Sequence, residues 1–475
     1  MTERFCPHYP PPQAERPSAW RMFFSKRRSW LDALYARSYH MKMGEVHLPG
    51  VDLYMVNEPS LVRRVMVEEA GAFPKHEMLG DALRPLLGDS IFTTNGDVWR
   101  RQRALMDPSF EAARIRHVFG RMREASEAMA ARLRRVPEGA EHDVEIEMTH
   151  VAADIILRTI LSQPLDSAAA RQIFEAFARY QALAPRLMMP AFFGLRWLRP
   201  WWQIGRSRRA AAEIRSLLST LIRPRFDAAC AGNATEEGDI LATLLRVRDQ
   251  HSGAGFGFDE LVDQVAMLFL AGHETSASAL SWALHLLAHA PDVQQRLHDE
   301  AAQVFDPASD DPGAMKDLVL ARNVFREALR LFPPVGFLAR QSAQDCTMRD
   351  KRVPRGASVV VSPWLIQRHR ALWARPDEFD PDRYDEAATV ATTDDALPVR
   401  ESLRRAYLPF GMGPRVCIGA AFAQQEASLI LATLAREFRF EPVAGHVPEP
   451  VGRLTIRAGN GIRLRVHQRR GGEAR

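Results

Sequence analysis

The stretch Phe410-Gly411-Met412-Gly413-Pro414-Arg415-Val416-Cys417-Ile418-Gly419 decides the fold. An alanine-rich apolar run follows at 420–434 and predicts a helix whose N-terminus lies at the cysteine. A thiol there faces the positive end of the helix dipole and free backbone N–H groups, and both favour the thiolate, the form that ligates metal. Gly411 and Gly413 admit backbone conformations that are closed to other residues, so a tight turn can enclose the sulfur.

A lone cysteine in a glycine-rich turn usually packs as a small hydrophobe. This one does not stand alone, because its surroundings resemble the Phe-x-x-Gly-x-Arg-x-Cys-x-Gly loop of the cytochrome P450 family at every fixed position. The resemblance implies that Cys417 is the axial thiolate of haem b iron. It also implies that the loop surrounds the haem. There Phe410 excludes water, Gly411 shapes the turn, Gly419 lets the helix lie close to the flat cofactor, and Arg415 pairs with a carboxylate.

Length and composition place few divisions in the chain. The 475 residues are 46% hydrophobic and contain no linker, repeat or low-complexity block. We therefore expect one domain over 1–475, with an irregular arm at 1–20 and a basic tail at 468–475. Four scattered cysteines argue against a disulfide framework or a multi-cysteine zinc site. A net charge of +5 with mixed signs does not call for a nucleic-acid partner.

The sequence offers no membrane anchor. Positions 1–13 are polar and proline-rich, and neither a spanning run of about 20 apolar residues nor a signal-peptide core is visible. Membrane-bound members of the resembled family carry such an anchor, so we expect a soluble, bacterial-type, cytoplasmic monomer. The broken apolar segment 186–202 leaves three alternatives open: a lid over an apolar pocket, a patch that dips weakly into a membrane surface, and plain core packing.

A long apolar helix is predicted over 259–290 and ends at Pro291. Its middle reads Ala271-Gly272-His273-Glu274-Thr275-Ser276. A lone Glu-Thr pair would usually be satisfied by helix carbonyls, but this stretch resembles the family's (Ala/Gly)-Gly-x-(Asp/Glu)-Thr motif completely. The resemblance implies that Gly272 leaves room for dioxygen, Thr275 hydrogen-bonds the iron-bound oxygen and Glu274 relays protons. His273 occupies the variable position and is interpreted as a packing or hydrogen-bonding residue.

Two further patterns match the family in the expected order. Trp99 and Arg103 share a helical face at i,i+4, which alone would be a solvated basic patch. They resemble the Trp-x-x-x-Arg element that holds a haem propionate, and Arg340 resembles a second propionate partner. Glu327 and Arg330, an ordinary ion pair by spacing, resemble the buried Glu-x-x-Arg motif whose third member is Arg383. This triad is expected to be structural.

The remaining chain predicts a mainly α fold with a smaller β region. Helix is expected within 20–41, a hairpin over 45–56 around Pro49-Gly50, a strand at 358–364 and a hairpin of 454–457 with 461–466. The segment 72–94 reads as an irregular loop. The resemblance implies a cytochrome P450-like fold, in which the central helix and the C-terminal helix sandwich the haem and 72–94 covers the substrate pocket.

The resemblance implies a monooxygenase that inserts one atom of O2 into a hydrophobic molecule such as a fatty acid, terpenoid, steroid or aromatic. Substrate contacts are expected from Val335, Phe337, Leu454, Phe269 and Ala271. Nothing follows the haem domain, so electrons should come from a ferredoxin or flavodoxin with its reductase, attracted to the cysteine side by Arg415 and neighbouring basic residues. A peroxide-driven peroxygenase and a non-catalytic gas-binding haem protein remain the alternatives.

Overall fold

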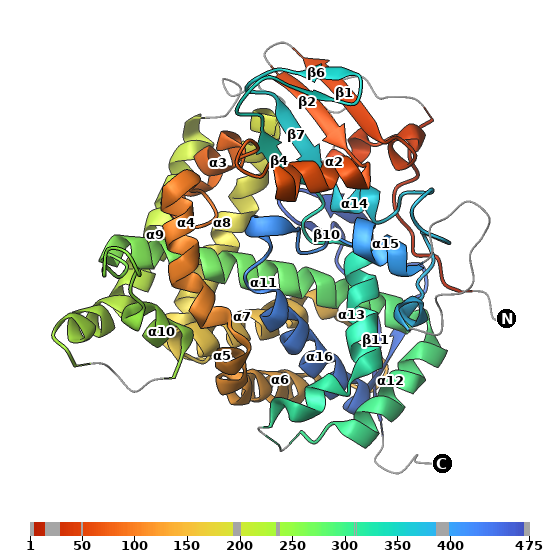
Figure 1. Cartoon of the computed structure of the whole chain (residues 1–475). Coiled ribbons are helices and arrows are strands. Elements are labelled where there is room, and N and C mark those ends of the chain that lie inside the picture. The colour runs from red at the N-terminus through yellow and green to blue at the C-terminus, as the bar shows by residue number, and fades with distance from the viewer. Residues whose placement is uncertain are drawn as a thin grey trace.

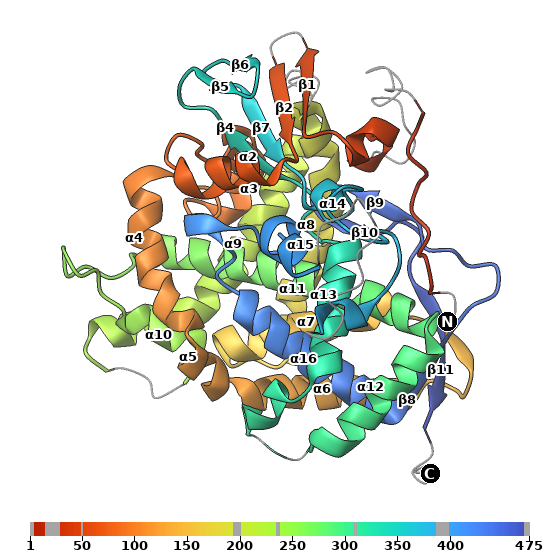
Figure 2. The same cartoon turned by 45° about the vertical axis from the view of Figure 1, so that its right-hand side comes forward.

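The computed structural model describes residues 4–14, 29–48, 51–192, 201–233, 238–307, 309, 311–385 and 399–469 (Figures 1 and 2). Its α-helices are α2 Pro59–Arg63, α3 Glu77–Leu87, α4 Gly96–Met106, α5 Ala112–His117, α6 Phe119–Leu133, α7 Val144–Leu161, α8 Ala168–Phe192, α9 Trp201–Cys230, α10 Ile240–Arg246, α11 Phe258–Ala288, α12 Pro291–Val304, α13 Val319–Leu331, α14 Pro363–Ile366, α15 Val399–Ala406 and α16 Ala420–Glu437. Its strands are β1 Met43–Leu48, β2 Val51–Val56, β3 Ala140–Asp143, β4 Leu338–Gln341, β5 Cys346–Met348, β6 Lys351–Val353, β7 Ser358–Val361, β8 Phe438–Pro442, β9 Pro450–Gly452, β10 Ile456–Ala458 and β11 Arg463–Gln468.

The largest sheet stands at one side of the helical body, at the top of Figure 1, in the order β1-β2-β7-β4. β1 and β2 form the hairpin predicted around positions 49 and 50, with Met43 opposite Val56 and Leu48 opposite Val51. β7 pairs parallel to β2 and antiparallel to β4, so residues distant in sequence complete the sheet. β4 follows α13 in the chain and so connects the helical body to this sheet.

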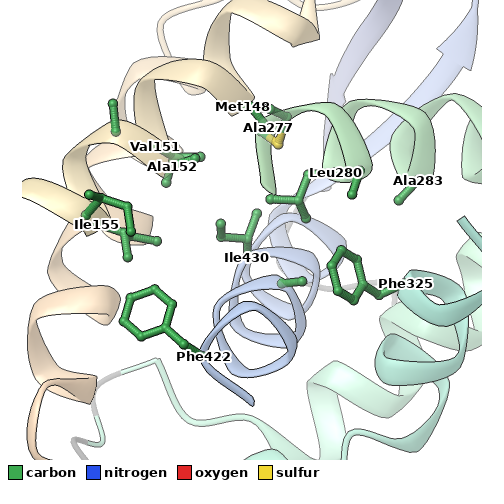
Figure 3. Close-up of a cluster of buried hydrophobic side chains, with 14 of the residues drawn as sticks. Met148, Val151, Ala152, Ile155, Ala277, Leu280, Ala283, Phe325, Phe422 and Ile430 are labelled. Atoms are coloured by element: carbon green, nitrogen blue, oxygen red, sulfur yellow. The ribbon is translucent and has the colours of Figure 1, made fainter. Parts of the chain in front are cut away.

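The core lies around α11, which crosses the middle of the molecule in both views. Figure 3 shows how α7, α13 and α16 pack against it. Small residues on α11 admit close neighbours, and each large apolar side chain buried there contributes about 1.5–3 kcal/mol. The labelled members of this buried cluster are Met148, Val151, Ala152, Ile155, Ala277, Leu280, Ala283, Phe325, Phe422 and Ile430. This packing fixes α11 relative to α16, the two helices predicted to enclose the cofactor.

The predicted structural triad is present and buried. Arg330 donates to both carboxylate oxygens of Glu327 at 2.8 Å, and Arg383 Nε donates to Glu327 Oε1 at 3.1 Å. Tyr384 adds a hydroxyl donor at 2.9 Å. Burial alone would raise the pKa of Glu327, but the two arginines and these hydrogen bonds outweigh it and lower that pKa to about 2.

Two expectations about local structure were wrong, and the helix expected within 20–41 forms only in part of the described residues. Segment 72–94 is not wholly irregular, because α3 forms within it and ends at Gly88, whose φ is +47°. The described part of 20–41 contains two short 3-10 helices, Trp30–Ala33 and Ala36–Tyr39. The expected hairpin of 454–457 with 461–466 does not form. Instead β10 pairs with β9, and β11 lies between β3 and β8, because these more distant partners outcompete the local turn.

Several predicted segments fall partly outside the described residues. These are most of the basic tail 468–475, part of the arm 1–20 and the centre of the apolar segment 186–202. The described arm is irregular, as expected, and Phe5 of the arm stacks on His289 with ring centroids 4.3 Å apart. None of the helices that the structure describes combines the length and the apolar character that a membrane crossing needs.

Candidate functional site

A cavity of about 370 Å³ lies between α11 and the loop that carries Cys417. α3, α7 and α11 contribute mainly aliphatic side chains to its wall, and the segment before β4 adds Val335 and Phe337. The polar groups at the cavity include Cys417, the middle of α11, Glu426 of α16 and a cluster of basic residues. A large apolar cavity with a few converging polar groups is the usual form of a small-molecule site.

The cysteine loop has the tight geometry that its glycines predict. Gly411 and Gly413 adopt φ of +71° and +72°. A Cβ on Gly413 would lie 2.1 Å from the backbone oxygen of Met66, so only glycine fits this close contact. Cys417 N donates to Phe410 O at 2.9 Å and closes the loop, which leads directly into α16. The thiol is therefore held at the helix N-terminus and exposed to the cavity.

The thiol environment differs from the expected one. Burial raises the pKa of Cys417, although the N–H of Gly419 and the charge of Arg103 act in the opposite direction. The helix N-terminus alone therefore does not produce a thiolate here. A bound metal ion would, since coordination removes the thiol proton outright. Apart from Gly419 itself and its two chain neighbours, no atom of the described residues lies within 4 Å of the position that a Cβ on Gly419 would take, which leaves room for a flat group beside the sulfur.

Three cations meet at one side of the cavity without a carboxylate partner among the residues that the structure describes. They are Lys75, Arg340 and Arg415. Burial and the two arginines lower the pKa of Lys75 to about 6, and burial and Arg415 lower that of Arg340 to about 10. Clustered, desolvated cations are costly unless an anion joins them. The cluster therefore fits the two carboxylates of a haem, and sequence analysis missed Lys75.

The other predicted propionate contacts lie beside this cluster. Trp99 lines the cavity under the guanidinium of Arg415, 4.3 Å from the ring centroid. Arg103 also lines it, but its side chain bonds Asp107 at 2.6 Å and Val416 O at 2.8 Å, so it braces the cysteine loop. Arg415 is half-buried and turned inward. Its expected contribution to the attraction of an electron carrier stays a prediction.

The polar middle of α11 faces the cavity through one side. Thr275 Oγ1 donates to Ala271 O at 2.5 Å, and both residues line the cavity. Glu274 is buried, with Oε1 accepting from Thr455 Oγ1 at 2.6 Å and Oε2 from Gln181 Nε2 at 2.8 Å. A Cβ on Gly272 would lie 2.5 Å from Ile156 Cδ1 of α7, so a larger residue at this position would have to displace the end of that side chain.

Sequence analysis missed a second carboxyl group at the cavity, Glu426 of α16. Ser276 Oγ of α11 donates to its Oε2 at 2.9 Å, and its Oε1 has no partner in the described part of the chain. Burial raises the pKa of Glu426 to about 8, so the group is mainly protonated at neutral pH. Its position nine residues beyond Cys417 on an apolar helix was the only available signal.

Four of the five predicted substrate contacts line the cavity: Val335, Phe337, Leu454 and Ala271. Phe269 does not, and its prediction was wrong. Its ring packs 4.3 Å from that of Phe177 on α8, because the side chain leaves α11 on the face away from Ala271.

Comparison with known proteins agrees with this geometry. The family model for cytochrome P450 matches residues 10–459. Cyclooctatin synthase of Streptomyces melanosporofaciens is 32% identical over 91% of this chain and 90% of its own. Pentalenene oxygenase of Streptomyces avermitilis is 30% identical over 96% of both chains. The crystal structure of the cytochrome P450DA haem domain has a TM-score of 0.81 at 23% identity, covering 97% of this chain and 98% of its own, which shows a shared fold. The chain belongs to the cytochrome P450 family and is a monooxygenase of that family.

Proposed function

We propose that this protein uses haem b, ligated by Cys417, to insert one atom of O2 into a hydrophobic small molecule, with terpenoids as the first candidates. The observation that carries the proposal is an apolar cavity at which Cys417, the Glu274–Thr275 pair and a basic cluster without a carboxylate partner among the described residues meet. The bound haem supplies the activation of O2 and the transfer of oxygen.

Each of the residues around the cavity has its own role in binding the haem or in shielding it from water. Cys417 ligates the iron, and Lys75, Arg340 and Arg415 hold the two propionates by charge-assisted hydrogen bonds. Trp99 supports the Arg415 guanidinium from below. Phe410 and the aliphatic wall exclude bulk water, which strengthens these polar contacts.

Protons reach the cavity through α11. The Thr275 hydroxyl, which donates to Ala271 O, can rotate to present its proton to a group bound in the cavity. Glu274, the neighbouring carboxyl group, is placed to take up a proton and then deliver it to this region as a general acid. Glu426 offers a further protonated carboxyl on the α16 side.

The substrate class follows from the wall and from the relatives. The wall is largely aliphatic, and the basic cluster is taken up by the propionates, so a neutral apolar substrate fits best. Pentalenene oxygenase and cyclooctat-9-en-7-ol 5-monooxygenase, which is 30% identical over 86% of this chain, act by their names on an apolar hydrocarbon and on an alcohol. Both support a terpenoid over a fatty acid, steroid or simple aromatic.

A separate electron carrier, a ferredoxin or flavodoxin with its reductase, is proposed to dock on the cysteine side. Arg100 of α4 is 65% exposed and lies close enough to Arg415 to lower the pKa of that residue. Arg404 and Arg405 are exposed on α15, just before the cysteine loop. Such charges would attract an acidic carrier, and the association should weaken as salt is added.

The test is the absorption spectrum of the reduced protein under carbon monoxide. The wild type and a Cys230→Ala control should show the strongly red-shifted Soret band of a thiolate–haem complex, and Cys417→Ala should lose it. An ordinary histidine-like band in the wild type, or failure to bind haem, would refute the proposal. For the substrate, pentalenene, dodecanoic acid, testosterone and naphthalene are titrated into the ferric protein. A response to dodecanoic acid alone would reject the terpenoid assignment.

A further inference from the structure

Glu274 is held by an arrangement that the family motif does not specify. Both of its oxygens accept from neutral donors on two other elements, Gln181 of α8 and Thr455 between β9 and β10. The residue is only 6% exposed, and no cation pairs with it among the described residues. Two donors on opposite oxygens fix the rotation of the carboxylate, so its orientation depends on where those donors lie.

His273 determines how Gln181 points. Its Nδ1 lies 2.7 Å from Phe269 O, and since a carbonyl only accepts, Nδ1 must carry the proton. The buried ring is neutral at physiological pH because burial lowers its pKa to about 4. Its Nε2 is therefore an unprotonated acceptor, and it lies 3.3 Å from Gln181 Nε2.

The two hydrogens of the Gln181 amide are thus both used, one toward Glu274 Oε2 and one toward His273 Nε2. Rotating the amide by half a turn would place its oxygen against the lone pair of His273 Nε2, and that contact is repulsive. Only one amide orientation is compatible with its neighbours, so the network assigns it. In the chain of hydrogen bonds from the Phe269 carbonyl through His273 and Gln181 to Glu274, every contact therefore joins a donor to an acceptor.

We propose that His273 and Gln181 are positioning residues that orient the Glu274 carboxylate for proton delivery. His273 acts through Gln181, and Gln181 ties Glu274 to α8. This inference rests on the proposed role of Glu274 as the proton relay. The plain alternative is that the three side chains only satisfy one another as buried polar groups, in which case removing the donors would change stability but not the fate of the electrons.

Three variants separate these readings. Gln181→Leu removes both N–H donors of the side-chain amide and leaves a side chain of similar size. His273→Phe keeps aromatic packing against Phe177 and Phe269, whose centroids lie 6.1 and 4.6 Å from the His273 ring, but removes the acceptor. Gln172→Leu, at an exposed position of α8, is the matched control. All three should keep the wild-type carbon monoxide spectrum, since none of the altered side chains lines the cavity.

The first readout is the fate of electrons from NADPH, delivered by a ferredoxin and its reductase without organic substrate. Hydrogen peroxide released per NADPH should rise in Gln181→Leu and His273→Phe, and the fraction of electrons that reduce O2 to water should fall about ten-fold. This loss is smaller than the ~10²–10⁴-fold that a general acid contributes, because Glu274 itself is still present. Peroxide-driven oxidation of guaiacol should be unchanged, because peroxide already supplies reduced oxygen and protons. Gln172→Leu should match the wild type in both assays.

The second readout is ¹⁵N NMR of histidine-labelled protein, with the His273 signal identified by its loss in His273→Phe. The signal should show the neutral Nδ1–H tautomer at pH 7, and its Nε2 shift should change in Gln181→Leu but not in Gln172→Leu. An Nε2–H tautomer, or unchanged peroxide release in both variants, would overturn the inference while leaving the proposed function intact. Loss of the thiolate band in Gln181→Leu would also overturn it. A wild type without that band would refute the proposed function, whatever the tautomer.

Discussion

Lys75 is the residue whose role depends most on its surroundings. Nothing in its local sequence distinguishes it from a surface lysine, yet it lines the cavity, and its Nζ donates to Ile91 O. Burial and the neighbouring Arg415 and Arg340 lower its pKa to about 6, so its charge is unstable until an anion arrives. The fold thus holds a buried amine whose cationic form becomes favourable only when an anion binds beside it.

We expect Lys75→Met to weaken haem retention while stabilising the haem-free protein. Losing a hydrogen bond to a charged group costs about 1.5–3 kcal/mol, so haem should dissociate about ten-fold faster or more. The haem-free protein gains because the Lys75 amine, whose pKa is lowered to about 6, no longer has to give up its proton and its hydration on folding. Haem transfer to apomyoglobin measures the first effect and urea unfolding the second. Lys42→Met, at an exposed position, serves as control, and unchanged haem transfer in Lys75→Met would contradict the assignment.

At the scale of elements, a hydrogen bond joins α11 to α16: Ser276 Oγ donates to Glu426, whose carboxyl group can be protonated or ionised. The folded-state pKa of Glu426 is raised to about 8 by burial, whereas the unfolded chain titrates at the usual acidic value of 4.5. A raised folded-state pKa means that stability is complete below the unfolded value and is lost as the pH rises toward 8.

Glu426→Gln should therefore become progressively more stable than the wild type as the pH increases. Between pH 5 and pH 7 the difference in free energy of unfolding should grow by about 3 kcal/mol. Urea titrations at several pH values measure it, with the exposed Glu175→Gln as a control that shows no such trend. A difference that stays flat from pH 5 to pH 8 would mean that Glu426 is ionised in the fold.

Elements with strong local signals were predictable, and those governed by distant partners were not. The hairpin of β1 and β2 and the long α11 follow from their own sequence periodicity and turn residues. β11 pairs with β3, more than 300 positions earlier, so no local pattern could specify it. The same distinction holds in the site, where motifs specified Cys417 and Thr275, whereas Lys75, Gln181 and Glu426 matter only through contacts that the folded chain creates.

At the scale of the whole molecule, the Glu327–Arg330–Arg383 triad joins α13 to the 374–384 segment that leads toward the cysteine loop. Arg383 Nη1 also donates to Ala374 O at 2.9 Å, and Arg330 Nη1 donates to Gln367 O at 3.0 Å. All three side chains are at most 1% exposed. The triad therefore fixes the path of the chain that leads toward the cysteine loop.

Arg383→Met should destabilise the protein by about 3–5 kcal/mol, because it leaves part of a buried carboxylate charge uncompensated. Arg296→Met is the matched control, since Arg296 pairs with Asp382 at 2.6 Å but is 48% exposed, and it should cost less than about 1 kcal/mol. Urea midpoints measure both. Equal, small losses in the two variants would show that the triad is not a structural lock.

The close approach of Gly413 to the Met66 backbone has a consequence for biosynthesis. The loop that carries Cys417 takes its shape from residues made roughly 350 positions earlier, and Arg103 of α4 bonds the same loop. Domains begin to fold from the N-terminus during synthesis. The early part of the chain can therefore prepare its side of the cavity on the ribosome, but the ligating sulfur is absent until Cys417 emerges. Haem capture should consequently be among the final events in the maturation of this protein, and a nascent chain stalled before Cys417 should bind no haem through sulfur.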